Sequence, residues 1–122
     1  MTTDTKRQTW ERYNRLWDPG ELAAKRANFA GLLSSRCVYT DPLARTQGWD
    51  ELLAYMAAFH QQFPGCRFLT TRFLAHNDRC VAHCNMVDGA GEVVSDGISY
   101  GEFAEDGSLR TMTGFFEVPA AA

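Results

Sequence analysis

The feature that most constrains the fold is a change of hydrophobic period at Pro64-Gly65. Before this point, large apolar residues recur every three or four positions, as in Trp10, Tyr13 and Trp17, which is typical of one face of a helix. After it, apolar and polar residues alternate, which is typical of half-buried strands. Helices followed by a run of antiparallel strands predict an α+β fold.

The element boundaries follow from turn and capping signals. A first helix should end at Asp18-Pro19-Gly20, and a second should begin near Gly20 and bury Leu22, Phe29, Leu32 and Leu33. A short strand is expected at 36–40 and a third helix at 48–63, with Leu52, Tyr55, Met56 and Phe59 on one face. Strands are expected at 66–76, 79–88, 92–104 and 109–118.

Length and composition narrow the function classes. We expect one domain over residues 1–122, because the chain has 122 residues of which 45% are hydrophobic. The net charge of −3 and the interspersed charges give no basic surface for nucleic acid. The N-terminus lacks a signal-peptide core and no apolar run is long enough to span a membrane, so we expect a cytoplasmic protein. The four cysteines lack metal-ligand spacing, so we expect buried free thiols and no metal site.

The stretch VYTDPLARTQG, residues 38–48, places a carboxylate directly after a strand. Asp41 with Pro42 has two interpretations. It is either a turn residue whose side chain binds a backbone amide, or a carboxylate presented to a pocket as a base.

Taken in order along the chain, these motifs resemble the nuclear transport factor 2-like superfamily. The relevant branch contains the ketosteroid isomerases and the SnoaL-like polyketide cyclases. The resemblance rests on the element order, the Asp-Pro after the first strand, Gly48 before the third helix and the C-terminal FAEDGSLRTMTGFFE. It implies a cone-shaped α+β barrel, in which three N-terminal helices pack on a curved, mainly antiparallel sheet.

The resemblance also implies site residues. Asp41 matches the general base of ketosteroid isomerases and Tyr13 matches the tyrosine that stabilises the enolate oxygen. The family's protonated aspartate is replaced by Ser99, which leaves an auxiliary donor at that position. Tyr39 and Tyr55 compete with Tyr13 for the donor role.

Strand alternation then predicts the pocket wall. If Ser99 faces inward, Gly101 and Phe103 do so too. On the strand at 79–88 the resemblance implies that Ala82, Cys84 and Met86 face inward, which turns His83 and Asn85 outward. A slip of one residue would reverse this arrangement. The full set expected to bind substrate is Trp10, Trp17, Tyr55, Met56, Phe59, Cys84, Met86, Phe103, Met112 and Phe116.

Together these features predict a cofactor-independent enzyme of isomerase or cyclase type that acts on a small, apolar, carbonyl-bearing ligand. Two alternatives remain open. One is a binding protein without catalysis, and the other is an epoxide hydrolase, for which Arg67 or Arg72 would have to face inward. The resemblance further implies a homodimer formed through the outer face of the sheet, near Arg72, His76, His83 and Asn85.

Overall fold

The computed structural model describes residues 2–118. The order is α1 (Thr3–Arg15), α2 (Leu22–Phe29), β1 (Leu33–Thr40), β2 (Arg45–Gln47), α3 (Trp49–Gln62), β3 (Arg67–His76), β4 (Arg79–Val87), β5 (Val93–Phe103) and β6 (Leu109–Phe115). The predicted change from helical to extended structure after Pro64-Gly65 is confirmed. The strand expected at 36–40 forms as β1, which starts three residues earlier, and the short strand β2 beside it was not predicted.

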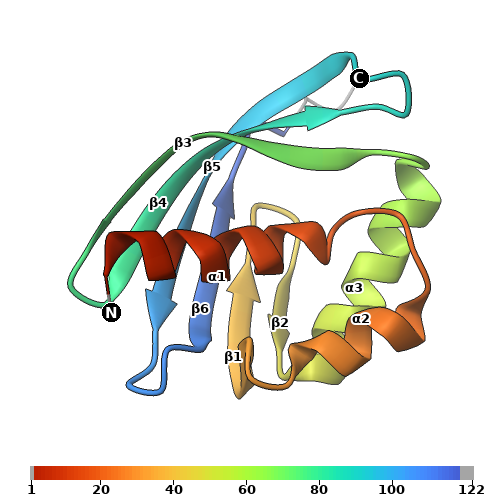
Figure 1. Cartoon of the computed structure of the whole chain (residues 1–122). Coiled ribbons are helices and arrows are strands. Elements are labelled where there is room, and N and C mark those ends of the chain that lie inside the picture. Colours follow the sequence, from red (N-terminus) through yellow and green to blue (C-terminus); the bar gives the residue numbers. More distant parts are fainter. Residues whose placement is uncertain (1, 119–122) are drawn as a thin grey trace.

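The six strands form one curved sheet in the order β2-β1-β6-β5-β4-β3. All neighbouring pairs are antiparallel except β1 with β6, which is parallel. Figure 1 shows α1 lying across the concave side of this sheet, with α2 and α3 beside β1 and β2. The arrangement is the predicted cone-shaped α+β fold, and the sheet is not closed.

The helices are set by local signals. Thr2 accepts a hydrogen bond from the Thr5 amide and caps the N-terminus of α1. Gly48 precedes α3 with a φ of 83°, a left-handed conformation that glycine adopts at no steric cost. The Glu51 carboxylate, in the first turn of α3, accepts from the Gln47 amide at the end of β2 and ties the start of the helix to that strand.

Lys25 stabilises the segment that connects α1 and α2 by hydrogen bonds to its backbone carbonyls. Its buried ammonium donates to the carbonyl of Leu16 at 2.6 Å and to the carbonyl of Asp18. These acceptors flank Trp17, so the same contact fixes the tryptophan at the end of α1. Burial lowers the pKa of Lys25, and the nearby charge of Asp18 opposes that shift.

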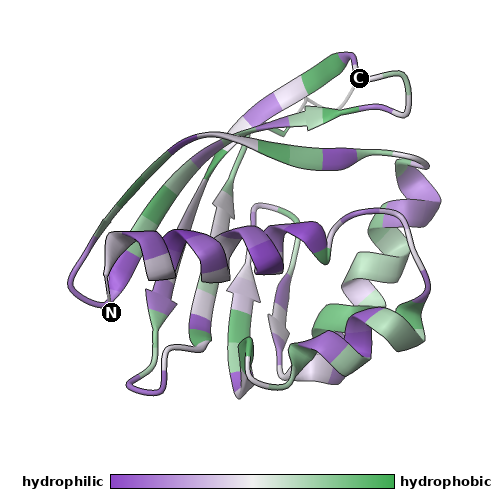
Figure 2. Ribbon diagram, viewed as in Figure 1, coloured by the Kyte–Doolittle hydropathy of each residue, from purple (hydrophilic) through white to green (hydrophobic). Residues whose placement is uncertain are grey.

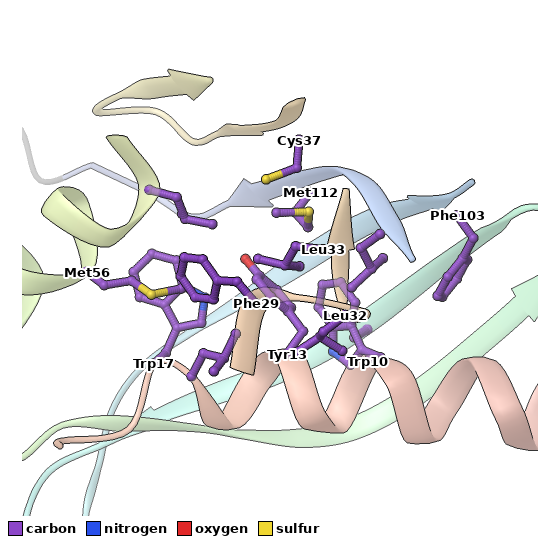
Figure 3. Packing of buried hydrophobic residues seen from close by; sticks show 14 of the residues in the cluster. Trp10, Tyr13, Trp17, Phe29, Leu32, Leu33, Cys37, Met56, Phe103 and Met112 are labelled. Carbon is purple, nitrogen blue, oxygen red and sulfur yellow. The ribbon is translucent and has the colours of Figure 1, made fainter. Parts of the chain in front are cut away.

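The core lies between the helices and the concave face of the sheet. Figure 3 shows side chains from α1, from α2 and the segment that follows it, and from the strands pointing toward one another. Phe29, Leu32 and Leu33 are buried as predicted, but α2 ends at Phe29, so Leu32 lies in the turn after the helix and Leu33 begins β1. The prediction for Leu22 is wrong: it is 41% exposed, because α2 turns its first residue toward solvent and buries Lys25 and Phe29 instead.

The strand register agrees with the predicted alternation. Ala82 pairs with Ser99 and Met86 pairs with Ser95, and Ala82 is fully buried. A bulge between Thr70 and Arg72 shifts the pattern on β3, so Arg67 and Arg72 are both exposed. The sequence pattern, read without this bulge, had predicted opposite directions for the two arginines. Figure 2 shows how polar and apolar residues intermingle along the strands.

Within residues 2–118, no helix combines the length and the apolar character needed to cross a bilayer.

Candidate functional site

The interior is hollow at the end where α1 stops. A pocket of about 230 Å³ opens between α3 and the sheet. Its lining is largely apolar and consists of Trp17, Asp41, Leu43, Tyr55, Ala58, Phe59, Gln62, Phe63, Phe68, Met86, Ser95 and Phe116. A mostly apolar lining with a few polar groups is the usual composition of a small-molecule site.

Aromatic rings form much of this wall. The Trp17 ring stands edge-on to the rings of Tyr55, Phe59 and Phe68, with interplanar angles of 87–88° and centroids 5.7–6.1 Å apart. Phe59 and Phe68 stack on each other at 5.3 Å. Perpendicular and offset rings are the preferred aromatic arrangements, so the wall is held by its own contacts.

Asp41 provides the charge of the pocket. Its Oδ1 accepts from the backbone amides of Leu43 and Ala44 at 2.8 and 3.0 Å. Its Oδ2 accepts from the hydroxyls of Tyr39 and Tyr55, each at 2.7 Å. The first interpretation drawn from the sequence is therefore correct for Oδ1, which binds the turn amides, while Oδ2 lies with the two tyrosine hydroxyls beside the pocket.

The two tyrosines differ in their exposure to the pocket. Tyr55 lines it, whereas Tyr39 packs behind it against the Trp17 ring at 5.3 Å. Burial and the neighbouring Asp41 charge raise the pKa of both hydroxyls above that of free tyrosine, with burial the larger cause. Both tyrosines therefore remain protonated and donate to Asp41 across the neutral range.

Gly114 on β6 lies beside this group. A β-carbon at Gly114 would lie 3.4 Å from the Tyr39 hydroxyl and 3.6 Å from the Asp41 β-carbon, which are ordinary van der Waals distances. The strand β6 therefore passes close to the Tyr39–Asp41 pair, with space for one additional carbon.

The structure brings some of the expected site residues together and separates others. Trp17, Asp41, Tyr55, Phe59, Met86 and Phe116 line the pocket. Trp10, Tyr13, Met56, Phe103 and Met112 lie in the packed core, each no more than 3% exposed.

Tyr13, the expected oxyanion donor, lies outside the pocket lining. Burial raises the pKa of its hydroxyl, and a hydrogen bond with Trp17 opposes that shift. Ser99 is half-buried. Burial raises the pKa of the neighbouring Cys84 thiol, whose Sγ donates to the Gly97 carbonyl at 3.8 Å. Cys84 borders a separate open hollow of about 450 Å³ that includes His83 and Asn85.

Several lining residues were not expected from the sequence, namely Leu43, Ala58, Gln62, Phe63 and Phe68. Leu43 and Phe68 depend on the path of the chain after Asp41 and on the β3 register. Gln62 and Phe63 continue the α3 face that carries Tyr55 and Phe59, so helical spacing could have identified them.

Among the described residues, no group of three histidine, cysteine or acidic side chains is placed to hold a metal ion.

Comparison with known proteins gives a consistent result. A candidate isomerase of the SnoaL-like family from Agrobacterium tumefaciens matches with a TM-score of 0.87 and 20% identity, covering 94% of this chain and 99% of that one. A candidate ketosteroid isomerase from Kribbella flavida matches with a TM-score of 0.68 and 19% identity, over 98% of this chain and 83% of that one.

A candidate SnoaL-like polyketide cyclase from Jannaschia matches with a TM-score of 0.70 and 18% identity, over 90% of this chain and 85% of that one. At these identities the structural matches establish the fold alone. No curated protein matches the sequence. The family model described as the SnoaL-like domain matches residues 10–112. This chain therefore belongs to the SnoaL-like domain family, within the nuclear transport factor 2-like superfamily.

Proposed function

We propose that the protein is a small-molecule enzyme of the ketosteroid isomerase and polyketide cyclase type, in which Asp41 transfers a proton at a carbon next to a carbonyl group. The observation that carries this proposal is the Oδ2 atom of Asp41, which is presented at an aromatic pocket and hydrogen-bonded to the pocket residue Tyr55. Family membership supports the general class of isomerase or cyclase chemistry.

The hydrogen-bond count at Asp41 determines how the reaction would proceed. A carboxylate offers about four acceptor sites, and four donors already engage Asp41. To take a proton from a substrate carbon, Oδ2 must release one tyrosine hydroxyl. Tyr55 is the one that a bound substrate reaches, because Tyr39 lies behind the pocket wall.

This exchange places a donor where negative charge develops. The substrate C–H bond breaks, its proton binds to Oδ2, and the electron pair moves onto the carbonyl oxygen to form an enolate. The Tyr55 hydroxyl, released from Oδ2, then donates to that enolate oxygen and stabilises it. In this proposal Tyr55 takes the donor role for which Tyr13 was expected from the resemblance, and Tyr39 keeps the carboxyl group in place.

The test uses 2-tetralone, a small apolar ketone with exchangeable α-protons. The wild-type protein should accelerate the exchange of these protons for deuterium, followed by NMR. Asp41→Asn should lose this acceleration by about 10²- to 10⁴-fold, the usual contribution of a positioned base. Asp50→Asn makes the same change at a side chain that is 93% exposed and should leave the rate unchanged.

Binding separates a catalytic defect from loss of the pocket. The affinity for 2-tetralone, measured by tryptophan fluorescence, should remain within a few-fold in Asp41→Asn. If the wild-type protein binds the ketone without accelerating exchange, the protein is a binder and the catalytic proposal is wrong. Epoxide hydrolysis has less support, because Arg67 and Arg72 are exposed and neither lines the pocket.

We also propose a homodimer through the outer face of the sheet. Leu69, Leu74, Ile98 and Phe115 are 42–58% exposed, and strand pairing puts Leu74 beside Val81 and Ile98 beside His83 and Phe115 on that face. Exposed apolar side chains gathered on one face favour association. Sedimentation equilibrium should give a mass of twice 13.7 kDa, and a monomer at micromolar concentration would contradict the dimer.

A further inference from the structure

The charge and hydrogen-bond polarity of the pocket define a ligand class that the proposed function leaves unspecified. Among the described residues that line it, Asp41 is the one charged side chain, and there is no lysine, arginine or histidine. The ion pairs found within residues 2–118 do not include Asp41. Its negative charge is therefore balanced by hydrogen bonds from neutral donors and not by a protein cation.

The hydrogen bonds around Asp41 have a fixed direction. The Tyr55 hydroxyl donates its single hydrogen to Oδ2. Its oxygen can therefore only accept a hydrogen bond from a ligand in the pocket. All the donors that surround Asp41 are directed at the carboxylate itself. Without a ligand, Asp41 and Tyr55 present a negative charge and hydrogen-bond acceptors to the pocket, and they present no hydrogen-bond donor.

Aromatic rings make up much of the pocket wall beside this carboxylate. Ring faces carry partial negative charge, and cations bind over them within about 6 Å of the ring centroid. Trp17, Tyr55, Phe59 and Phe68 border the same cavity as Asp41, with three of the ring planes perpendicular to Trp17. A cluster of rings with one carboxylate is the arrangement that binds alkylated ammonium groups.

From the pocket's single carboxylate, which has no cationic side chain as a partner, its acceptor-only tyrosine and its aromatic wall, we propose that the natural ligand carries a tertiary or quaternary ammonium group, seated against the rings next to Asp41. A quaternary ammonium needs no hydrogen-bond acceptor, so it can bind while both tyrosine bonds to Oδ2 remain intact. This inference goes beyond the proposed function, since it applies whether the pocket catalyses a reaction or only binds.

The experiment compares two ligands of equal shape. These are (3-hydroxyphenyl)trimethylammonium and 3-tert-butylphenol, which differ in the positive nitrogen that replaces a carbon. Isothermal titration calorimetry of the full chain should show that the cation binds at least about tenfold more tightly. The neutral ligand is the more hydrophobic of the two, so a preference for the cation cannot arise from apolar transfer.

Two variants assign the preference to the pocket. Asp41→Asn should weaken binding of the cation by at least about tenfold and leave 3-tert-butylphenol within about threefold. Phe68→Leu keeps an apolar side chain but removes a ring, and it should lower the ratio of the two affinities even if Asp41→Asn does not fold. Asp50→Asn should change neither affinity, because that carboxylate is far more exposed than Asp41 and borders a different part of the surface.

The proposal is overturned if 3-tert-butylphenol binds as tightly as the cation or more tightly, if neither ligand binds, or if the preference survives in both Asp41→Asn and Phe68→Leu. These outcomes are distinct from failure of the proposed function. Loss of 2-tetralone exchange in Asp41→Asn, with no preference for the cation, would support the proton transfer and reject the ammonium ligand. A cation preference without any exchange activity would support the ammonium ligand and reject the proton transfer.

Discussion

The two ends of the cone interior are built from similar residues, but side chains fill one end and enclose a pocket at the other. At one end Trp10, Phe103 and Leu109 fill the space between α1 and the sheet, and none is more than 3% exposed. At the other end Trp17, Phe59 and Phe68 surround a hollow. Figure 3 shows Trp10 on α1 and Trp17 just beyond the end of that helix, toward opposite ends of the core.

The difference depends on what each end must accommodate. At the filled end, Gly101 has no side chain, and the Trp10 ring occupies that space together with Cys80 and Leu109. Burial there raises the pKa of the Cys80 thiol to about 12, so it remains protonated. At the open end, the carboxylate of Asp41 needs hydrogen-bond donors. Tyr39 and Tyr55 provide them, and the direction of their hydroxyls toward Asp41 leaves the cavity unfilled. Burying a charge without such donors would cost several kcal/mol, so the polar group and the hollow occur together.

The largest expected contrast comes from one substitution made at both ends. Phe103→Ala removes a side chain that is 3% exposed in a filled core, and it should lower the free energy of unfolding by roughly 3–5 kcal/mol. Phe63→Ala removes a ring that is 36% exposed at the pocket rim, and the loss should be about 1 kcal/mol. Urea denaturation measures both values.

Ligand binding should give the opposite order in the same two variants. Phe63→Ala should weaken the affinity for 2-tetralone, because the Phe63 ring borders the cavity. Phe103→Ala should leave that affinity largely unchanged under conditions in which the variant is folded. Equal destabilisation by the two substitutions would show that the open end is packed as tightly as the closed one.

The sequence predicted the fold better than it predicted the site. The sequence pattern placed three helices and five of the six strands, because periodicity and turn signals are local properties. β2 was missed since Arg45–Gln47 is short and its pairing with β1 depends on the Asp41 turn. Alternation from Ser99 predicted that Gly101 and Phe103 face inward on β5, and the resemblance selected Ala82 on β4; all three are buried.

The candidate site depends on distances that no local pattern encodes. Asp41 was identified from its position before Pro42, and Tyr39 and Tyr55 were weighed only as competitors of Tyr13. Their convergence on Oδ2 requires the end of β1 and the middle of α3 to meet, and this contact is set by tertiary packing. Tyr13 has the spacing of the family's donor, but its ring is buried in the core. The ring that lines the pocket is Trp17, four residues further along the chain.

A smaller contrast tests why the two ends differ, using glycines on adjacent strands. A β-carbon at Gly101 would lie 3.1 Å from both the Cys80 sulfur and the Trp10 ring, and 3.2 Å from Leu109. At Gly114 the nearest atoms lie at 3.4 and 3.6 Å, which is close to ordinary van der Waals contact. Gly101→Ala should therefore destabilise the protein by about 1–2 kcal/mol through overpacking. Gly114→Ala should stay within about 0.5 kcal/mol of wild type, because the lower chain entropy of the unfolded state offsets a mild contact.

The denaturant midpoint should move for Gly101→Ala with an unchanged slope, which attributes the effect to stability and not to a change in the unfolded state. A neutral Gly101→Ala would mean that Trp10 and Cys80 can shift by a few tenths of an ångström, so the filled end has unused space. A strongly destabilising Gly114→Ala would mean that the Tyr39–Asp41 group is as rigid as the core. In that case the open end is held by its hydrogen bonds as firmly as the closed end is held by packing, and the pocket is pre-formed before any ligand binds.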